Sequence, residues 1–148
     1  MRVVLQRVKH AQVSIKQESV GKINTGYLLL VGFEDKDGTE QIDYLVHKIV
    51  NLRVFEDEKH KMNLNLAKVN GSILSVSKFT LYADTKHGKR PGFTDAGDPK
   101  HAKKCYDQFN QKLREAGVIV ETGEFGADMQ VDLQNDGPVT IIYDTDQL

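Results

Sequence analysis

The fold of this chain is decided by the stretch Ser75-Val76-Ser77-Lys78-Phe79-Thr80-Leu81-Tyr82-Ala83-Asp84. Its apolar and aromatic residues are typical of a buried strand that continues through Leu81 and Tyr82. Two hydroxyls and a cation, those of Ser77, Thr80 and Lys78, interrupt this apolar run. Buried hydroxyls and charges cost free energy unless a partner satisfies them. The stretch is therefore either a core strand whose hydroxyls bond to neighbouring backbone or a strand that carries a site.

The segments around this stretch predict strands and two helices. The continuously apolar residues 27–33 predict a strand buried on both faces, and alternation predicts strands over residues 2–8 and 11–17. Asp37 or Thr39 is expected to cap a helix. The other predicted elements are a helix over 40–51, a second helix from Asp98-Pro99 to Gly117, a helical turn over 62–66, and short strands over 20–23, 53–55, 118–125, 129–133 and 139–143. Together they predict an α+β fold: a single domain, residues 1–148, with a largely antiparallel, barrel-like sheet and two main helices.

Composition limits the classes of protein to which the chain can belong. The chain has 148 residues, 39% of them hydrophobic, and a formal net charge of −1, so no global field attracts nucleic acid. Cys105 is the single cysteine, which excludes an internal disulfide and fits a reducing compartment. The first residues are too briefly apolar for a signal peptide, and no segment is long enough for a membrane span. We therefore expect a cytoplasmic protein that makes no use of a membrane.

Familiar catalytic constellations are not expected. The five histidines are scattered and are expected to lack the close partner or Cys companion of a zinc site, so no metal is predicted. No glycine-rich loop has phosphate-cradling spacing, so no nucleotide cofactor is predicted. Cys105 falls on the apolar stripe of its helix and is read as a packing thiol. An enzyme built from these residues would depend on positioning and on backbone donors for a developing oxyanion.

The segment that follows the central stretch, residues 85–93, is a basic loop with two glycines and a proline. It is either a solvated surface loop or a loop that contacts nucleic-acid phosphates. Both alternatives stay open on the sequence alone.

Four segments form a recognisable set: Met1-Arg2-Val3-Val4-Leu5-Gln6-Arg7-Val8, Ser77-Lys78-Phe79-Thr80-Leu81-Tyr82-Ala83-Asp84, Phe125-Gly126-Ala127-Asp128-Met129 and Asn135-Asp136-Gly137-Pro138-Val139-Thr140. In this order, from the first residue to the last strand, they resemble the D-aminoacyl-tRNA deacylase family. The resemblance implies a cytoplasmic homodimer, without a cofactor, that hydrolyses the ester between a D-amino acid and tRNA. It also implies removal of glycine mischarged onto alanine tRNA.

The resemblance also assigns site residues. Ser77, Phe79 and Thr80 would belong to the pocket for the 3′-terminal adenosine and the aminoacyl group, with Phe125 and Met129 as walls. The latter two are nearly as well explained as core residues. Lys78 stands where the family usually has Gln, and a lysine side chain only donates hydrogen bonds. Its side-chain contacts are therefore in doubt, whereas a role of its backbone N–H would survive.

Gly137-Pro138 corresponds to the family's chirality filter, a cis Gly-Pro pair that one subunit inserts into the partner's site. Gly137 has no Cβ, so its backbone can press against a ligand. Taken alone, Asn135-Asp136-Gly137-Pro138 is a turn signal between two strands, and a turn can also be the filter.

The mechanism implied by the resemblance is assisted by the RNA. The terminal ribose 2′-hydroxyl would help activate water, backbone N–H groups would stabilise the oxyanion, and Thr80 would position rather than attack. Two other functions stay open: a non-catalytic RNA-binding homodimer that kept the pocket, and a small-ligand pocket protein without an RNA partner.

Overall fold

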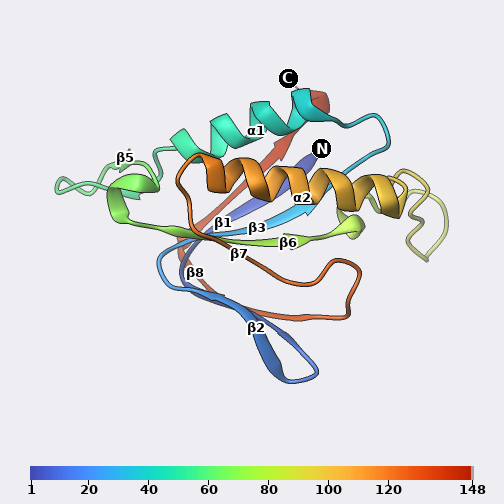
Figure 1. Ribbon diagram of the computed structural model, residues 1–148, viewed down its shortest axis with the longest axis horizontal. Helices are drawn as coiled ribbons and strands as arrows, with labels where there is room; N and C mark the ends of the chain where they lie inside the picture. The colour runs from blue at the N-terminus through green and yellow to red at the C-terminus, as the bar shows by residue number, and fades with distance from the viewer. Residues whose placement is uncertain (148) are drawn as a thin grey trace.

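Two helices lie over the same face of a strongly curved mixed sheet (Figure 1). The computed structural model describes residues 1–147. The strands of the main sheet are β1 (Arg2–Ile15), β2 (Glu18–Ile23), β3 (Gly26–Gly32), β6 (Ser72–Ser77), β7 (Val120–Thr122) and β8 (Gln130–Asp144). The other elements are the helices α1 (Thr39–Asn51) and α2 (Pro99–Glu115), the two-stranded sheet of β4 (Phe55–Glu56) and β5 (Met62–Leu64), and the 3-10 turns η1 (Ala67–Val69), η2 (Phe79–Tyr82) and η3 (Thr145–Gln147).

β1 organises the sheet because it pairs antiparallel with three strands, β2, β3 and β8. The sequence predicted two strands here, and that prediction is wrong: residues 2–15 form one strand. Its register against β8 shifts between Gln6 and His10. Val3 and Leu5, before the shift, pack into the core beneath the helices, whereas Val13, after it, packs into a second core inside the curved sheet.

One side of the sheet is parallel. β6 pairs with β3 and β7 pairs with β6, both in parallel. β3 is buried on both faces, as predicted from its continuous apolar run: Tyr27 and Leu29 face the helices, and Leu28 faces the inner core. The α+β fold with two helices and a sheet nearly closed into a barrel is therefore confirmed, with antiparallel pairing around β1 and parallel pairing at β6.

The two helices begin differently from one another. Asp98 caps α2 as predicted: its carboxylate accepts hydrogen bonds from the N–H groups of Lys100 (3.1 Å) and His101 (3.4 Å), and Pro99 is the first helical residue. The predicted cap of α1 at Asp37 or Thr39 is wrong, because Gly38 is the N-cap residue. The Asp37 carboxylate instead pairs with the Met1 amino group at 2.8 Å, and both groups are buried.

The predicted central strand ends earlier than expected. β6 stops at Ser77, and residues 79–82 form the 3-10 turn η2 instead of more strand. One carbonyl of η2 is bonded from far along the chain, because the Arg2 guanidinium donates to the Leu81 carbonyl at 2.8 Å. Arg2 also stacks over the buried Tyr82 ring, 4.5 Å from its centroid. These contacts turn the chain away from the sheet at Ser77.

Two smaller predictions also change. Residues 62–64 form strand β5 rather than a helical turn, because they pair with β4 across a loop whose N–H groups donate to the Asp57 carboxylate. Residues 130–144 form one strand rather than two, and Gly137-Pro138 lies in a bulge of this strand opposite β1. Among residues 1–147, no helix is long and apolar enough to cross a membrane.

Candidate active site

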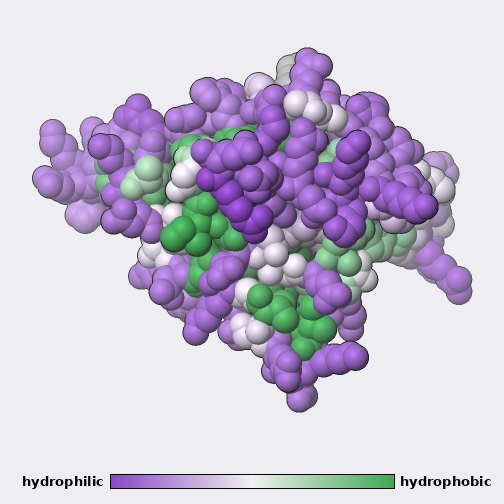
Figure 2. Space-filling model, viewed as in Figure 1, coloured by the Kyte–Doolittle hydropathy of each residue, from purple (hydrophilic) through white to green (hydrophobic). Residues whose placement is uncertain are grey.

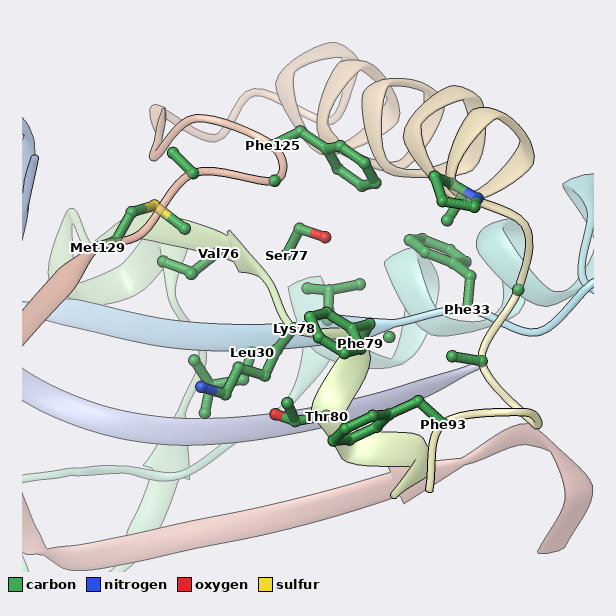
Figure 3. A pocket seen from close by; sticks show the side chains of 18 of the residues that line it. Leu30, Phe33, Val76, Ser77, Lys78, Phe79, Thr80, Phe93, Phe125 and Met129 are labelled. Atoms are coloured by element: carbon green, nitrogen blue, oxygen red, sulfur yellow. The ribbon is translucent and has the colours of Figure 1, made fainter. Parts of the chain in front are cut away.

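A cavity of about 710 Å³ opens where β6 ends (Figure 3). Its walls come from the ends of β3 and β6, the turn η2, the segment before α2, the first turn of α2, and the connection between β7 and β8. Six of the eight predicted site residues line it: Ser77, Lys78, Phe79, Thr80, Phe125 and Met129. The structure therefore brings together two sequence segments that lie about 50 positions apart.

Long-range hydrogen bonds hold the β6 side of the cavity. The Lys78 N–H donates to the Val31 carbonyl at 2.7 Å and extends the parallel ladder one residue beyond β6. The hydroxyl of Tyr106, on α2, donates to the Ser75 carbonyl at 2.6 Å, and both residues are buried. Burial also raises the pKa of the Tyr106 hydroxyl, so it remains a donor at neutral pH. The strand that carries Ser77 is thus fixed from both sides.

The start of η2, whose residues line the cavity, has two backbone donors without an acceptor among residues 1–147. In a 3-10 turn the first N–H groups have no acceptor within the turn. The N–H groups of Phe79 and Thr80 have no hydrogen-bond acceptor in the part of the chain that the structure describes. The Lys78 N–H, which the sequence offered as a working group, is already used by Val31. The candidate oxyanion donors are therefore those of Phe79 and Thr80.

Apolar and aromatic side chains form most of the remaining wall. Figure 3 shows Phe33, Phe79, Phe125 and Met129 around the Ser77 side chain. Phe79 is 59% exposed, and its ring contacts Phe93 edge to face at 5.0 Å between centroids. An exposed ring supported by a second, half-buried ring gives a flat ligand such as a base a surface on which to stack.

The charged groups at the cavity are three carboxylates and one ammonium. Asp35 and Asp98 are engaged with the backbone: Asp35 accepts from the Asp98 N–H at 2.7 Å, and Asp98 caps α2. Asp128 and Lys78 are exposed. No histidine or cysteine lines the cavity among residues 1–147, so the hydroxyls of the wall have no imidazole or thiolate beside them. This arrangement supports chemistry by positioning and by backbone donors rather than by a nucleophile–base pair.

Gly137 and Pro138, the other two predicted residues, do not line this cavity. They are exposed in the bulge of β8, and their peptide bond is cis. The buried Arg7 supports the bulge: its Nε donates to the Asp136 carbonyl at 3.1 Å, and its Nη1 donates to the Val54 carbonyl. A Cβ on Gly137 would lie 2.8 Å from Arg7 Nη2 and 2.9 Å from Val139 Cγ2 at a φ of +124°, so any other residue here is strained and displaces its neighbours.

One prediction about the histidines is wrong. His101 and Cys105 lie one helical turn apart on α2, and Cys105 Sγ is 3.5 Å from His101 Nε2. That Nε2 also lies 2.7 Å from the Asp37 carbonyl oxygen. No cluster of three or more His, Cys, Asp or Glu side chains that could hold a metal ion occurs within residues 1–147. Cys105 is buried as predicted, and burial raises the pKa of its thiol.

Sequence reasoning did not single out several residues that line the cavity or support the Gly137 bulge. Arg7 lies in the first quoted motif, but its support of the Gly137 bulge depends on a pairing between the two ends of the chain. Phe33 and Phe93 were read as parts of a strand and a loop, and the fold places both at the cavity. The apolar character of Phe93 within a basic loop was the one available signal.

Known proteins resemble this chain along almost its whole length. The sequence profile of the family described as D-Tyr-tRNA(Tyr) deacylase matches residues 4–144. A D-aminoacyl-tRNA deacylase of Limosilactobacillus reuteri (strain DSM 20016) is 66% identical over 144 residues, 97% of this chain and 99% of the relative. Another, of Bifidobacterium animalis subsp. lactis (strain AD011), is 55% identical, with 100% of this chain and 99% of the relative covered.

Two solved structures share the fold. A protein described as "c-Myc DNA Unwinding Element Binding Protein" superimposes with a TM-score of 0.92 at 38% identity, covering 98% of this chain and 99% of its own. A "probable eukaryotic D-amino acid tRNA deacylase" superimposes with a TM-score of 0.80 at 19% identity, covering 96% and 97%, which shows a likeness of fold alone. The family profile and the two sequence relatives show that the chain belongs to the D-Tyr-tRNA(Tyr) deacylase family, whose members are hydrolases that act on aminoacyl-tRNA.

Proposed function

We propose that the chain hydrolyses the ester between a D-amino acid and the 3′ end of tRNA, and that it also removes glycine mischarged onto alanine tRNA. The observation that carries this proposal is the cavity, which unites Ser77, Phe79 and Thr80 with Phe125 and Met129. Its aromatic mouth suits the terminal adenine, and its apolar interior suits an amino acid side chain. Hydrolysis needs water as the only co-reactant, so the reaction requires no cofactor.

The chemistry proposed here is assisted by the RNA. Water attacks the ester carbonyl, the carbonyl oxygen becomes an oxyanion, and the ribose oxygen leaves with a proton. The 2′-hydroxyl of the terminal ribose, next to the ester, helps to activate the water. The N–H groups of Phe79 and Thr80 would hold the oxyanion, because they lack other acceptors among the described residues. Removing such a donor typically lowers kcat by about 10²–10³-fold.

The side chains have supporting roles in this proposal. The Thr80 hydroxyl orients the ester or the water and does not attack, since no imidazole or thiolate lines the cavity beside it. Ser77 also lines the cavity and contacts the substrate by its hydroxyl. Lys78 is exposed at the mouth, where its ammonium meets solvent or a phosphate.

We further propose that Gly137-Pro138 of a second copy completes the site and rejects L-amino acids. Three features support this proposal. The pair is exposed, lies outside its own chain's cavity, and follows Asp136, whose carbonyl accepts a hydrogen bond from Arg7. β8, which carries the pair, is bonded to β1 alone among residues 1–147, and Ile142 on it is 71% exposed. An unpaired strand edge with exposed apolar side chains favours association with another chain.

The decisive test compares D-Tyr-tRNA and L-Tyr-tRNA at equal, low enzyme concentration. Rapid loss of the D ester with the L ester intact supports both the reaction and the filter. Cleavage of both esters at equal rates would support the proposed reaction and contradict the proposed filter. If neither ester is cleaved above background, the proposed catalytic activity is wrong. Mass determination by light scattering tests the homodimer separately, since a monomer at assay concentration would contradict a filter supplied by a partner.

The alternative is a nucleic-acid-binding homodimer without turnover. The relative described as a DNA unwinding element binding protein is the specific observation in its favour. Binding of tRNA or single-stranded DNA with no ester cleavage would support it. A small-ligand pocket protein would differ again, because tRNA would not compete for its cavity. We also propose a cytoplasmic location, because it agrees with a tRNA substrate and with one unpaired cysteine.

A further inference from the structure

Charge is distributed unevenly along this chain. Residues 85–104 contain six Lys or Arg and two Asp, a formal charge of +4, whereas the other residues together carry −5. The overall charge of −1 therefore conceals a basic segment in an acidic protein. Basic clusters on one face are the usual electrostatic footprint of nucleic-acid binding.

The middle of the basic segment lines the cavity. Phe93, Ala96, Gly97, Asp98, Pro99 and Ala102, all from this segment, line the cavity. The cations flank these lining residues on both sides in the sequence. Five exposed ones form what we call the mouth surface: Lys86, Lys89, Arg90, Lys100 and Lys104. Figure 1 shows the loop that carries the first three beside the beginning of α2, which carries the other two.

No carboxylate of residues 1–147 is paired with the mouth surface, although Asp35, Asp98 and Asp128 line the cavity itself. Within residues 1–147 none of its five cations makes a salt bridge; the neighbouring Lys103 does, with Asp107 at 2.7 Å. The nearby Asp84 is occupied, since it accepts from the Lys86 N–H and from His87 Nδ1, each at 2.8 Å. The hydrogen bond from His87 lowers the pKa of Asp84, which keeps this carboxylate ionised. Asp84 therefore fixes the loop and leaves the Lys86 side chain to solvent.

Two lysines of the mouth surface form a row on α2. Lys100 and Lys104 are four residues apart, so their side chains lie on the same helix face, one turn apart. Figure 2 shows that the surface over the helices is hydrophilic. The positive end of the α2 dipole lies at the cavity and favours anions at this end of the helix.

We propose that the mouth surface binds the phosphates of the tRNA acceptor end, with Lys86, Lys89 and Arg90 contributed by the loop and Lys100 and Lys104 by the first two turns of α2. This inference rests on the proposed function, which places the 3′-terminal nucleotide in the cavity. The preceding nucleotides must leave through the mouth, and there their backbone meets the unpaired cations. The contacts are to phosphates, so they give affinity and orientation without reading sequence.

The test uses two substrates that differ in the length of RNA. One is full-length D-Tyr-tRNA, and the other is D-tyrosyl adenosine, which fills the cavity but lacks the preceding phosphates. The test variant is Lys100→Glu/Lys104→Glu. The matched control is Lys59→Glu/Lys61→Glu, which makes the same charge change on exposed lysines of the β4–β5 connection, at the opposite end of the molecule (Figure 1). Thermal melts confirm that both variants fold.

The expected result is a change in the preference between substrates. The test variant should shift the ratio of kcat/KM values about tenfold toward D-tyrosyl adenosine, as two lost ionic contacts predict. Its salt dependence on full-length tRNA should weaken by about one unit in log–log slope for each lost phosphate contact. The control variant should keep the wild-type ratio and slope.

Three results would overturn the inference: an unchanged ratio, an equal loss on both substrates, or the same shift in the control variant. Failure of the proposed function is distinguishable from failure of this inference, because the wild type would then cleave neither ester. Affinity for uncharged tRNA, measured by fluorescence anisotropy, then decides the inference alone. Weaker binding by the test variant than by the control would support the mouth surface, and equal binding would refute it.

Discussion

The hydroxyl of Tyr106 gives the sharpest prediction about stability, because it links α2 to the strand beneath the cavity. It donates to the Ser75 carbonyl at 2.6 Å, and Tyr106 and Ser75 are 4% and 0% exposed. Tyr106→Phe removes the donor and keeps the ring, so the carbonyl loses this partner in the interior. Loss of one partner of a buried hydrogen bond costs about 1–3 kcal/mol of unfolding free energy.

The companion variant Ser75→Ala changes the same part of β6, but we do not expect it to destabilise the protein. Ser75 Oγ is buried and has no hydrogen-bond partner among residues 1–147. A buried hydroxyl without a partner is unfavourable, so its removal should be neutral or stabilising by up to about 1–2 kcal/mol. The pair of variants therefore separates the tyrosine hydrogen bond from a general sensitivity of β6 to mutation.

Urea unfolding followed by far-UV circular dichroism measures both effects. With a slope of about 2 kcal/mol/M, Tyr106→Phe should lower the midpoint by about 0.5–1.5 M, and Ser75→Ala should leave it unchanged or raise it. A Tyr106→Phe midpoint equal to wild type would refute the hydrogen-bond argument. Destabilisation of Ser75→Ala as large as that of Tyr106→Phe would show that the serine hydroxyl has a partner and that the reasoning about it is wrong.

Four further predictions concern other parts of the molecule. Asp37→Asn leaves the buried amino group of Met1 without its counter-ion and should cost about 3–5 kcal/mol in urea unfolding. Gly137→Ala places a Cβ against Arg7 at a φ of +124°, and should lower stability by about 1–3 kcal/mol; a melting temperature equal to wild type would contradict it. Lys78→Gln should change kcat by less than about tenfold, or 1.4 kcal/mol, and a larger loss would show that the ammonium acts in the transition state. Burial raises the pKa of the Cys105 thiol in the folded protein. The stability that the protonated thiol contributes is fully present below the ordinary thiol pKa of about 8.5 and is lost as pH rises through the folded-state pKa. Cys105→Ala should therefore make unfolding free energy depend less on pH in this range.

Local patterns in the sequence determined several elements correctly. The apolar run of residues 27–33 predicts a strand buried on both faces because only such a strand can hide every side chain. Asp98-Pro99 predicts the start of α2 because its cap bonds connect residues two and three positions apart. The motifs at Ser77–Asp84 and Phe125–Met129 identified six residues that meet in the cavity.

Tertiary structure alone decided the features that depend on residues far apart in the chain. The chain leaves β6 at Ser77 and forms η2, whose Leu81 carbonyl is bonded by Arg2, 79 residues earlier in the sequence. The Lys78 N–H is occupied because β3 supplies the Val31 carbonyl, so the candidate oxyanion donors move to Phe79 and Thr80. Asp37 leaves its expected cap because the Met1 amino group is buried beside it. Local propensity covers only a few positions, whereas these choices depend on which distant donor or charge the fold brings within bonding distance.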